Sequence, residues 1–127
     1  MIRPLLEYCT GVWGCCGEVN SAILETLQKR VGKIVIKTPS SDTGMKAWKW
    51  PSLRSRHDEH ILKLVRKCLH SRCPQYFKNH FVFNKDIWAR STRQSNLLHL
   101  TARRKEVGKR SFYYHGSIVF NSYCKCP

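Results

Sequence analysis

Acidic side chains that could support catalysis are few in this chain. It has eight Asp and Glu residues, and Asp58-Glu59 is the one adjacent pair. On a helix, consecutive side chains diverge by about 100°, so these two carboxylates do not face a common metal ion or substrate. Near the start of a helix they are instead expected to offset the helix dipole. No nucleophile motif surrounds a serine or cysteine either, so we expect no enzymatic activity.

Cysteine and histidine are the alternative source of chemistry, as metal ligands. His60, Cys68, His70 and Cys73 lie close together in the sequence. However, C-x-H-x-x-C is not a standard spacing of structural zinc sites, and the chain has no C-x-x-C pair. The spacing favours helical packing, because a buried cysteine behaves as a small apolar residue. We therefore expect no metal or other cofactor, and no need for zinc in folding.

The seven cysteines also bear on the cellular compartment. An odd number of cysteines without a secretory signal is not typical of a disulfide scaffold. No stretch approaches the ~20 apolar residues that a membrane-spanning helix requires. The sequence therefore predicts an intracellular protein with reduced thiols, nuclear or cytoplasmic, that does not associate with a membrane.

The charge of the chain indicates a polyanionic partner. Its 127 residues contain 23 Lys and Arg against 8 Asp and Glu, which gives a net charge of +15 and a pI near 9.9. Residues 1–25 carry one arginine and three glutamates, so the positive excess lies downstream of them. Such a field attracts nucleic-acid backbone, the commonest polyanion in a cell. The alternatives are a solvated surface or a face that docks on an acidic partner.

The basic residues gather on predicted helices and in the tail, and we expect them to contact the backbone of RNA or DNA. The predicted contacts are Lys29, Arg30, Lys33, Lys37, Arg56, Lys63, Arg66, Lys67, Arg93, Arg103, Arg104, Lys105, Lys109 and Arg110.

The first element that must position them is an amphipathic helix over Leu24–Lys37. Its lysines recur every fourth residue, and Asn20 or Ser21 is expected to cap its first turn. Pro39 is expected to end it, because proline disfavours helical geometry in the preceding residue. The apolar stripe predicted to face the core consists of Leu24, Leu27, Val31, Ile34 and Val35.

A second helix of the same design is predicted over residues 53–70, with Ser52 as its cap. Before it, Trp48 and Trp50 alternate with lysine, and they could stack on bases or, as we prefer, fill the gap between helices. The residues expected within its broad apolar stripe are Leu53, His57, His60, Ile61, Leu64, Val65 and Cys68.

The rest of the chain predicts shorter elements. Residues 74–83 should form a short aromatic-rich helix, since proline suits the first helical position. Residues 84–100 are predicted to be irregular or extended, anchored by Leu97 and Leu100, and Ser111 to cap a last helix through Phe120. Together these elements predict a mainly α domain of about three to five helices with irregular basic connections. Its parts are 1–19 (packing segment), 20–83 (helical) and 84–127 (basic tail) within a single domain, 1–127.

Four sequence pieces, in this order, resemble one family over nearly the whole chain. They are P-L-L-E-Y with V-W (4–8, 12–13), L-E-T-L-Q-K-R (24–30), W-P-S-L-R-S-R (50–56), and S-T-R-Q-S-N-L followed by G-K-R-S-F (91–97, 108–112). The chain is similar to the region downstream of the reverse-transcriptase core in non-LTR retrotransposon polyproteins of the jockey-like and CR1-like kind. The W-N-x-L-P motif that commonly closes this region is replaced here by residues 120–124.

The resemblance implies the helical thumb and C-terminal extension of an RNA-directed DNA polymerase. The family's F/Y-A-D-D palm motif has no counterpart in this chain, so the implied fragment lacks the catalytic site. A thumb of this sort grips the template-primer duplex by its backbone, without reading its sequence. Two other interpretations stay open. The chain could be a recruited protein-interaction module that uses the surface left by the missing polymerase core, or a relic reading frame without selected function.

Overall fold

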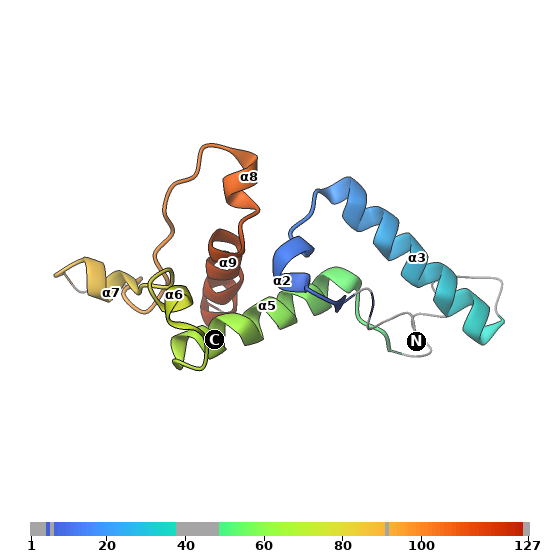
Figure 1. Cartoon of the computed structure of the whole chain (residues 1–127), viewed down its shortest axis with the longest axis horizontal. Helices are drawn as coiled ribbons and strands as arrows, with labels where there is room; N and C mark the ends of the chain where they lie inside the picture. The colour runs from blue at the N-terminus through green and yellow to red at the C-terminus, as the bar shows by residue number, and fades with distance from the viewer. Residues whose placement is uncertain (1–4, 6, 38–48, 91, 126–127) are drawn as a thin grey trace. The chain divides into compact units, whose positions relative to one another are not determined.

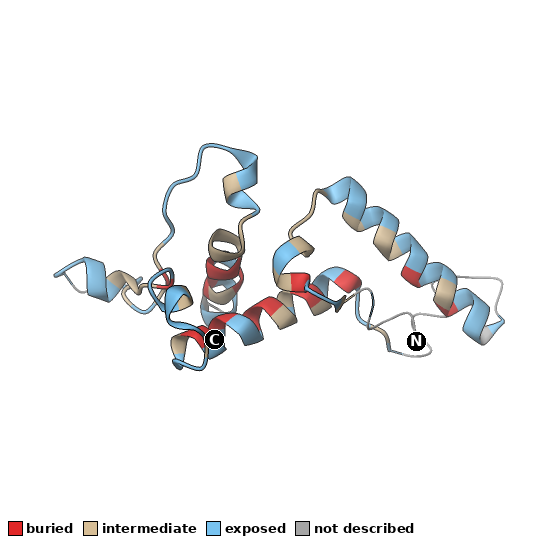
Figure 2. Cartoon of the chain, viewed as in Figure 1, coloured by how far each residue is buried: buried red, intermediate tan, exposed pale blue. Residues whose placement is uncertain are grey.

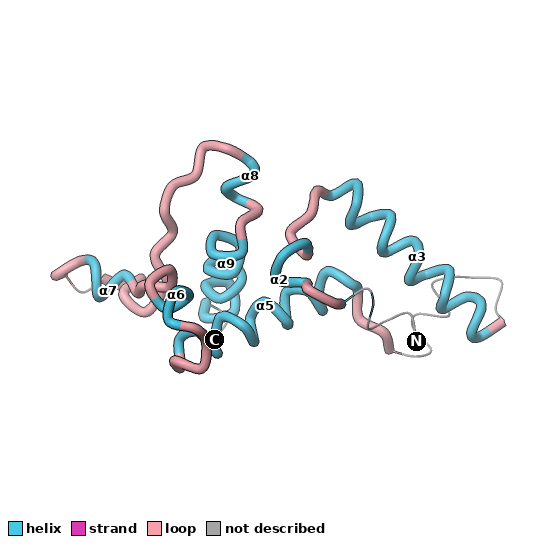
Figure 3. Tube along the Cα trace, viewed as in Figure 1, coloured by secondary structure: helices cyan, strands magenta, loops and turns pink. Residues whose placement is uncertain are grey.

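The computed structural model describes residues 5, 7–37, 49–90 and 92–125, and within them it confirms a mainly helical protein. Of the helices within these residues, three have 14 to 19 residues and four have a single turn of 4 residues. Loops join them (Figures 1 and 3). The described helices are α2 (Thr10–Trp13), α3 (Glu18–Ile36), α5 (Leu53–Leu69), α6 (Gln75–Lys78), α7 (Asn84–Ile87), α8 (Glu106–Lys109) and α9 (Phe112–Lys125).

The chain divides into two compact units, Met1–His57 (unit 1) and Asp58–Pro127 (unit 2). The boundary falls inside α5, at neither of the internal divisions that the sequence suggested. A continuous helix therefore belongs to both units. Whether the chain behaves as the single domain predicted from its length stays a prediction.

Unit 1 is held together largely by polar groups. The Leu53 N–H donates a hydrogen bond of 2.9 Å to a carboxylate oxygen of Glu25 on α3. One turn further along α3, the Gln28 amide donates to the Pro51 carbonyl at 3.1 Å. The rings of Trp13 and His57 meet edge to face with 5.0 Å between their centroids. These contacts tie α2 and α3 to the N-terminal end of α5, where the first N–H groups of the helix need acceptors.

The course of α3 differs from the prediction at its first turn. The helix begins at Glu18 after Gly17, and no side chain caps it, so Asn20 and Ser21 lie inside the helix. It ends at Ile36, where Lys37 adopts the left-handed conformation common at helix ends. Pro39, predicted to stop the helix, and Trp48 lie outside the described residues.

The inward face of α3 was predicted only in part, since two residues of the apolar stripe, Leu24 and Val31, are half-buried and the other three are exposed. Leu27, Ile34 and Val35 are 42%, 75% and 56% exposed, whereas Gln28 is buried. The physical reason is that the polar groups of Glu25 and Gln28 fix α3, so the other three apolar residues of the stripe stay exposed. Figure 2 accordingly shows α3 as a mostly exposed helix.

The second predicted helix is confirmed. Ser52 caps α5, since its hydroxyl oxygen accepts a 3.2 Å hydrogen bond from the Ser55 N–H. Five residues of the predicted stripe are buried: Leu53, His57, Ile61, Val65 and Cys68. The stripe is wrong at Leu64, which is exposed, whereas Leu62 is buried, because α9 packs on the side of α5 that carries Ile61 and Val65.

The core of unit 2 forms where α9 crosses α5 at Gly116. A Cβ atom built on this glycine would lie 2.9 Å from Val65 Cγ2, 3.6 Å from Ile61 and 3.7 Å from Phe81. Val65 and Ile61 are fully buried, at 0% exposure. Only a residue without a side chain allows this approach, so Gly116 sets the distance between the two helices.

We expect Gly116→Ala to lower the free energy of unfolding by about 1–2 kcal/mol. Overpacking a core costs about 1–3 kcal/mol, and the gain in helix propensity returns up to about 1 kcal/mol. Val65 is β-branched and cannot turn away easily. Gly108→Ala on α8 is the control, because its Cβ would meet the flexible Arg103 side chain at 3.4 Å. If urea unfolding gave Gly108→Ala a lower free energy of unfolding than Gly116→Ala, this packing would be contradicted.

The segment after α6 is anchored differently from the prediction. Leu98 is 1% exposed, whereas Leu100, a predicted anchor, is 41% exposed. The Leu98 N–H donates to Asn121 Oδ1 at 2.8 Å, and Asn121 Nδ2 donates to the Leu98 carbonyl at 3.0 Å. An isolated antiparallel bridge pairs Leu98 with Phe83. Asn121, on α9, therefore fixes this strand-like piece, which places Leu98 inward and Leu97 at the edge.

Candidate nucleic-acid interface

Unit 2 carries most of the positive charge. It contains 14 Lys and Arg against 4 Asp and Glu, a net charge of +10, while unit 1 has 9 against 4, a net charge of +5. Nearly all of these side chains that the structure describes are exposed. The field is therefore strongest around unit 2.

The exposed face of α5 carries a compact basic group. Lys63, Arg66 and Lys67 follow one another at helical spacings of three and four residues, and all three are exposed. With 100° between successive residues, they lie opposite the buried stripe of Ile61, Val65 and Cys68, as predicted. We call Lys63, Arg66 and Lys67 the α5 basic face.

A second basic group precedes and includes α8. Arg103, Arg104 and Lys105 lie exposed in the loop before this helix, and Arg110 follows it. Lys109, predicted as a nucleic-acid contact, forms an ion pair with Glu106 at 2.6 Å. The hydrogen bond between them, and then their charges, lower the pKa of Glu106 and raise the pKa of Lys109. Lys109 is therefore already engaged by a carboxylate.

In unit 1, the predicted lysine row is shorter than expected. Lys29 and Lys33 lie one turn apart on α3 and are exposed. Lys37 follows the helix end in the left-handed conformation, so it does not continue the row by helical geometry. Arg30 is exposed but lies about 100° around the helix from Lys29.

Two further predicted residues have different surroundings. Arg56 is half-buried, and its guanidinium forms an ion pair with Glu7, so it serves the interior of unit 1 instead of an open basic face. Helical periodicity could not reveal this partner, because Glu7 lies far away in the sequence. Arg93 is exposed in the turn between α7 and Leu98.

Sequence reasoning missed some exposed cations in unit 2. They lie in loops or short helices, where no periodicity marks them, and the only signal was the net charge of the segment. These residues are Arg72, Lys78, Lys85 and Arg90.

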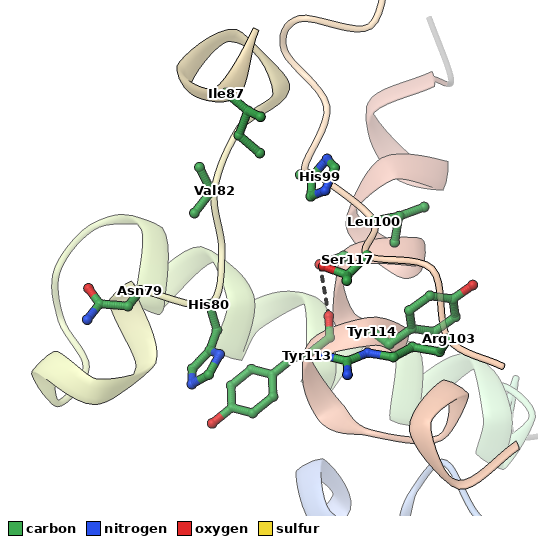
Figure 4. Close-up of a pocket in the computed structure, with 11 residues that line it drawn as sticks. Asn79, His80, Val82, Ile87, His99, Leu100, Arg103, Tyr113, Tyr114 and Ser117 are labelled. Carbon is green, nitrogen blue, oxygen red and sulfur yellow. Dashed lines mark hydrogen bonds between the residues drawn. The ribbon is translucent and has the colours of Figure 1, made fainter. Parts of the chain in front are cut away.

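It also missed a pocket of about 190 Å³ in unit 2. Its lining comes from the loop between α6 and α7, from Ile87 at the end of α7, from the segment 99–103 and from the first two turns of α9 (Figure 4). The rings of His80 and Tyr113 stack in its wall, 3.9 Å apart between centroids and inclined by 28°. Of the residues predicted to contact the nucleic-acid backbone, Arg103 alone also lines this pocket.

Asp58 and Cys68, two of the residues considered for catalysis or metal binding, each have a close partner in the fold. Asp58 Oδ1 lies 3.3 Å from His115 Nε2 of α9, so this carboxylate joins two helices of unit 2. The Cys68 thiol donates to Cys73 Sγ at 3.1 Å, and His70 is exposed. Among the described residues, no group of three or more His, Cys, Asp or Glu is placed to hold a metal ion. Nor does any helix in the described ranges have the length and apolar character needed to cross a membrane.

No family model matches the chain, and neither does any curated protein or solved structure.

Proposed function

We propose that this chain binds the phosphate backbone of RNA or DNA without sequence preference, mainly through unit 2. The observation that carries the proposal is the α5 basic face, exposed on the side of the helix opposite the core. It occurs in a unit with a net charge of +10. Lys and Arg side chains on a regular helix face offer donors to successive phosphate oxygens, and such contacts carry no sequence information.

We further propose that the chain is a non-catalytic fragment of a retrotransposon RNA-directed DNA polymerase. Its support is the ordered set of four sequence pieces described above, together with the basic helical surface that a polymerase thumb would need. A relic without selected function would retain the same surface for as long as it folds.

The salt dependence of binding tests the proposed function. Each phosphate neutralised on duplex DNA contributes about −0.9 to the slope of log K against log salt concentration, so about five contacts give a slope near −4 or −5. Replacing Lys63, Arg66 and Lys67 together by glutamine should flatten the slope by roughly two to three units. Glutamine keeps the helix propensity of these positions, so circular dichroism should not change.

The matched control is the triple glutamine variant of Lys29, Lys33 and Lys37, which removes the same charge from unit 1. If only the net charge mattered, the two triple variants would lose affinity equally. If the α5 basic face contacts the backbone directly, its triple variant (the unit 2 variant) should bind more weakly than the control. Parent binding that is indifferent to salt, or a unit 2 variant that binds as the parent does, would remove the proposal.

Protein binding is the second candidate function, and α3 is the observation that favours it. Val19, Ile23 and Ile34 are 75%, 57% and 75% exposed. Their spacing places them on one side of the helix, next to Lys29 and Lys33. An exposed apolar strip of this kind is typical of docking surfaces. This function becomes the better account if the salt experiment fails.

A further inference from the structure

The pocket of unit 2 has features that phosphate contacts alone do not require. Its volume of about 190 Å³ is below the ~300–1,000 Å³ of pockets that enclose drug-sized ligands. It is therefore suited to one small planar ring system and not to a larger molecule. Its wall also carries aromatic rings at an accessible position, which a purely ionic surface lacks.

The ring stack in the wall is a platform for a further ring. The ring of Tyr113 also packs against Phe77 and Phe81, with ring centroids 6.0 and 5.9 Å away. His80 lies on Tyr113 and is itself exposed (Figure 4). Tyr113 covers one face of the imidazole, and because His80 is exposed, a planar ligand can extend the stack on the other face. Tyr114, from the same helix, supplies another ring of the lining.

The charge of the pocket selects a ligand that carries an anionic group. Arg103 lines it, and the aliphatic part of this side chain rests against Gly108 at 3.4 Å from the position of an added Cβ. None of the described residues that line the pocket is Asp or Glu. Arg104 and Lys105 continue the chain from Arg103 and are exposed. A nucleotide combines these two features, a planar ring and a nearby negative charge.

We infer that this pocket holds one unpaired base of single-stranded RNA or DNA, stacked on His80, with the adjacent phosphate at Arg103. The inference rests on the proposed function and adds to it a preference for single strands over duplexes, whose bases are already stacked on one another. Stacking on an aromatic side chain accepts any base, so the preference is for the strand's state and not for its sequence.

Fluorescence anisotropy with three labelled ligands of about 12 nucleotides tests it, a length within the usual site size of single-strand binders. The ligands are oligothymidine, an abasic strand with the same phosphates, and the corresponding duplex. We expect oligothymidine to bind about tenfold more tightly than the abasic strand, because stacking of one base is absent from the latter. Equal affinity for these two strands would overturn the inference while leaving backbone binding intact. If neither strand binds, the proposed function falls as well.

Variants of the exposed wall then assign the effect to the pocket. His80→Ala should remove the difference between oligothymidine and the abasic strand, whereas His80→Phe should keep it, because phenylalanine retains the stacking surface. Arg103→Gln should weaken oligothymidine more than Arg90→Gln, which removes the same charge outside the pocket lining. A His80→Ala variant that still prefers oligothymidine by the parental factor would overturn the assignment.

Discussion

Asn121→Ala is expected to lower the free energy of unfolding by about 2–5 kcal/mol. The substitution removes both hydrogen bonds to Leu98, at 2.8 and 3.0 Å, and leaves a buried N–H and a buried carbonyl without partners. Each unsatisfied buried group costs about 1–3 kcal/mol. Leu98 is 1% exposed and Asn121 is 7% exposed, so water does not readily replace the lost partner. A loss of this size is a large fraction of the stability of a small domain.

Urea unfolding followed by circular dichroism measures the loss, and Ser122→Ala is the control. Ser122 is the next residue of α9, and its hydroxyl donates to the Val119 carbonyl of the same helix at 2.8 Å. It is exposed, so its removal should cost less than about 0.5 kcal/mol. The denaturation slope should stay constant if both variants unfold from the same compact state. Equal midpoints for the two variants would show that Asn121 does not anchor Leu98.

The same substitution connects stability with binding. Residues 99–103 follow Leu98 directly and form one side of the pocket. Loss of the Asn121 anchor should therefore reduce the preference for oligothymidine over the abasic strand before it reduces backbone binding. The α5 basic face lies on another element and should keep its affinity for phosphate.

Local sequence signals were sufficient for the start of α5 and for most of its buried stripe. Its start depends on the Ser52 hydroxyl three residues before Ser55, and its buried stripe depends on helical periodicity, both of which are local properties. The exposure of Lys63, Arg66 and Lys67 follows from the same periodicity. The helical class could be predicted for this reason, and so could the α5 basic face.

Elements fixed by distant partners could not be predicted in this way. The face of α3 is set by Glu25 and Gln28, which bond to residues 23 to 28 positions away. Leu98 is buried in preference to Leu97 because it bonds to Asn121, which is again 23 positions away. A periodic apolar pattern does not identify these polar partners, because it contains no information on which segments meet. The pocket could not be predicted from the sequence for the same reason, because three separate segments form its wall.

Cys68 should react with iodoacetamide at least about a hundredfold more slowly in the folded chain than in urea, because alkylation requires the thiolate. Burial, and then the hydrogen bond to Cys73 and its charge, raise the pKa of Cys68 from 9.0 to about 12. The thiol is 4% exposed, which slows the reagent further.

The raised pKa of Cys68 also makes stability depend on pH. The folded state holds this proton more tightly than the unfolded state, so the contribution is fully present below pH 9 and is lost as the pH rises toward 12. Trypsin separates Cys68 from Cys73 by cleaving after Lys67 and Arg72, so mass spectrometry can follow each thiol. Cys124, an exposed thiol on α9, is the internal control and should react at similar rates in both states. Alkylation of Cys68 in native buffer at the rate seen in urea would mean that this thiol is not buried in the core of unit 2. The assignment of the α5 basic face to the opposite, exposed side of the helix would then lose its structural support.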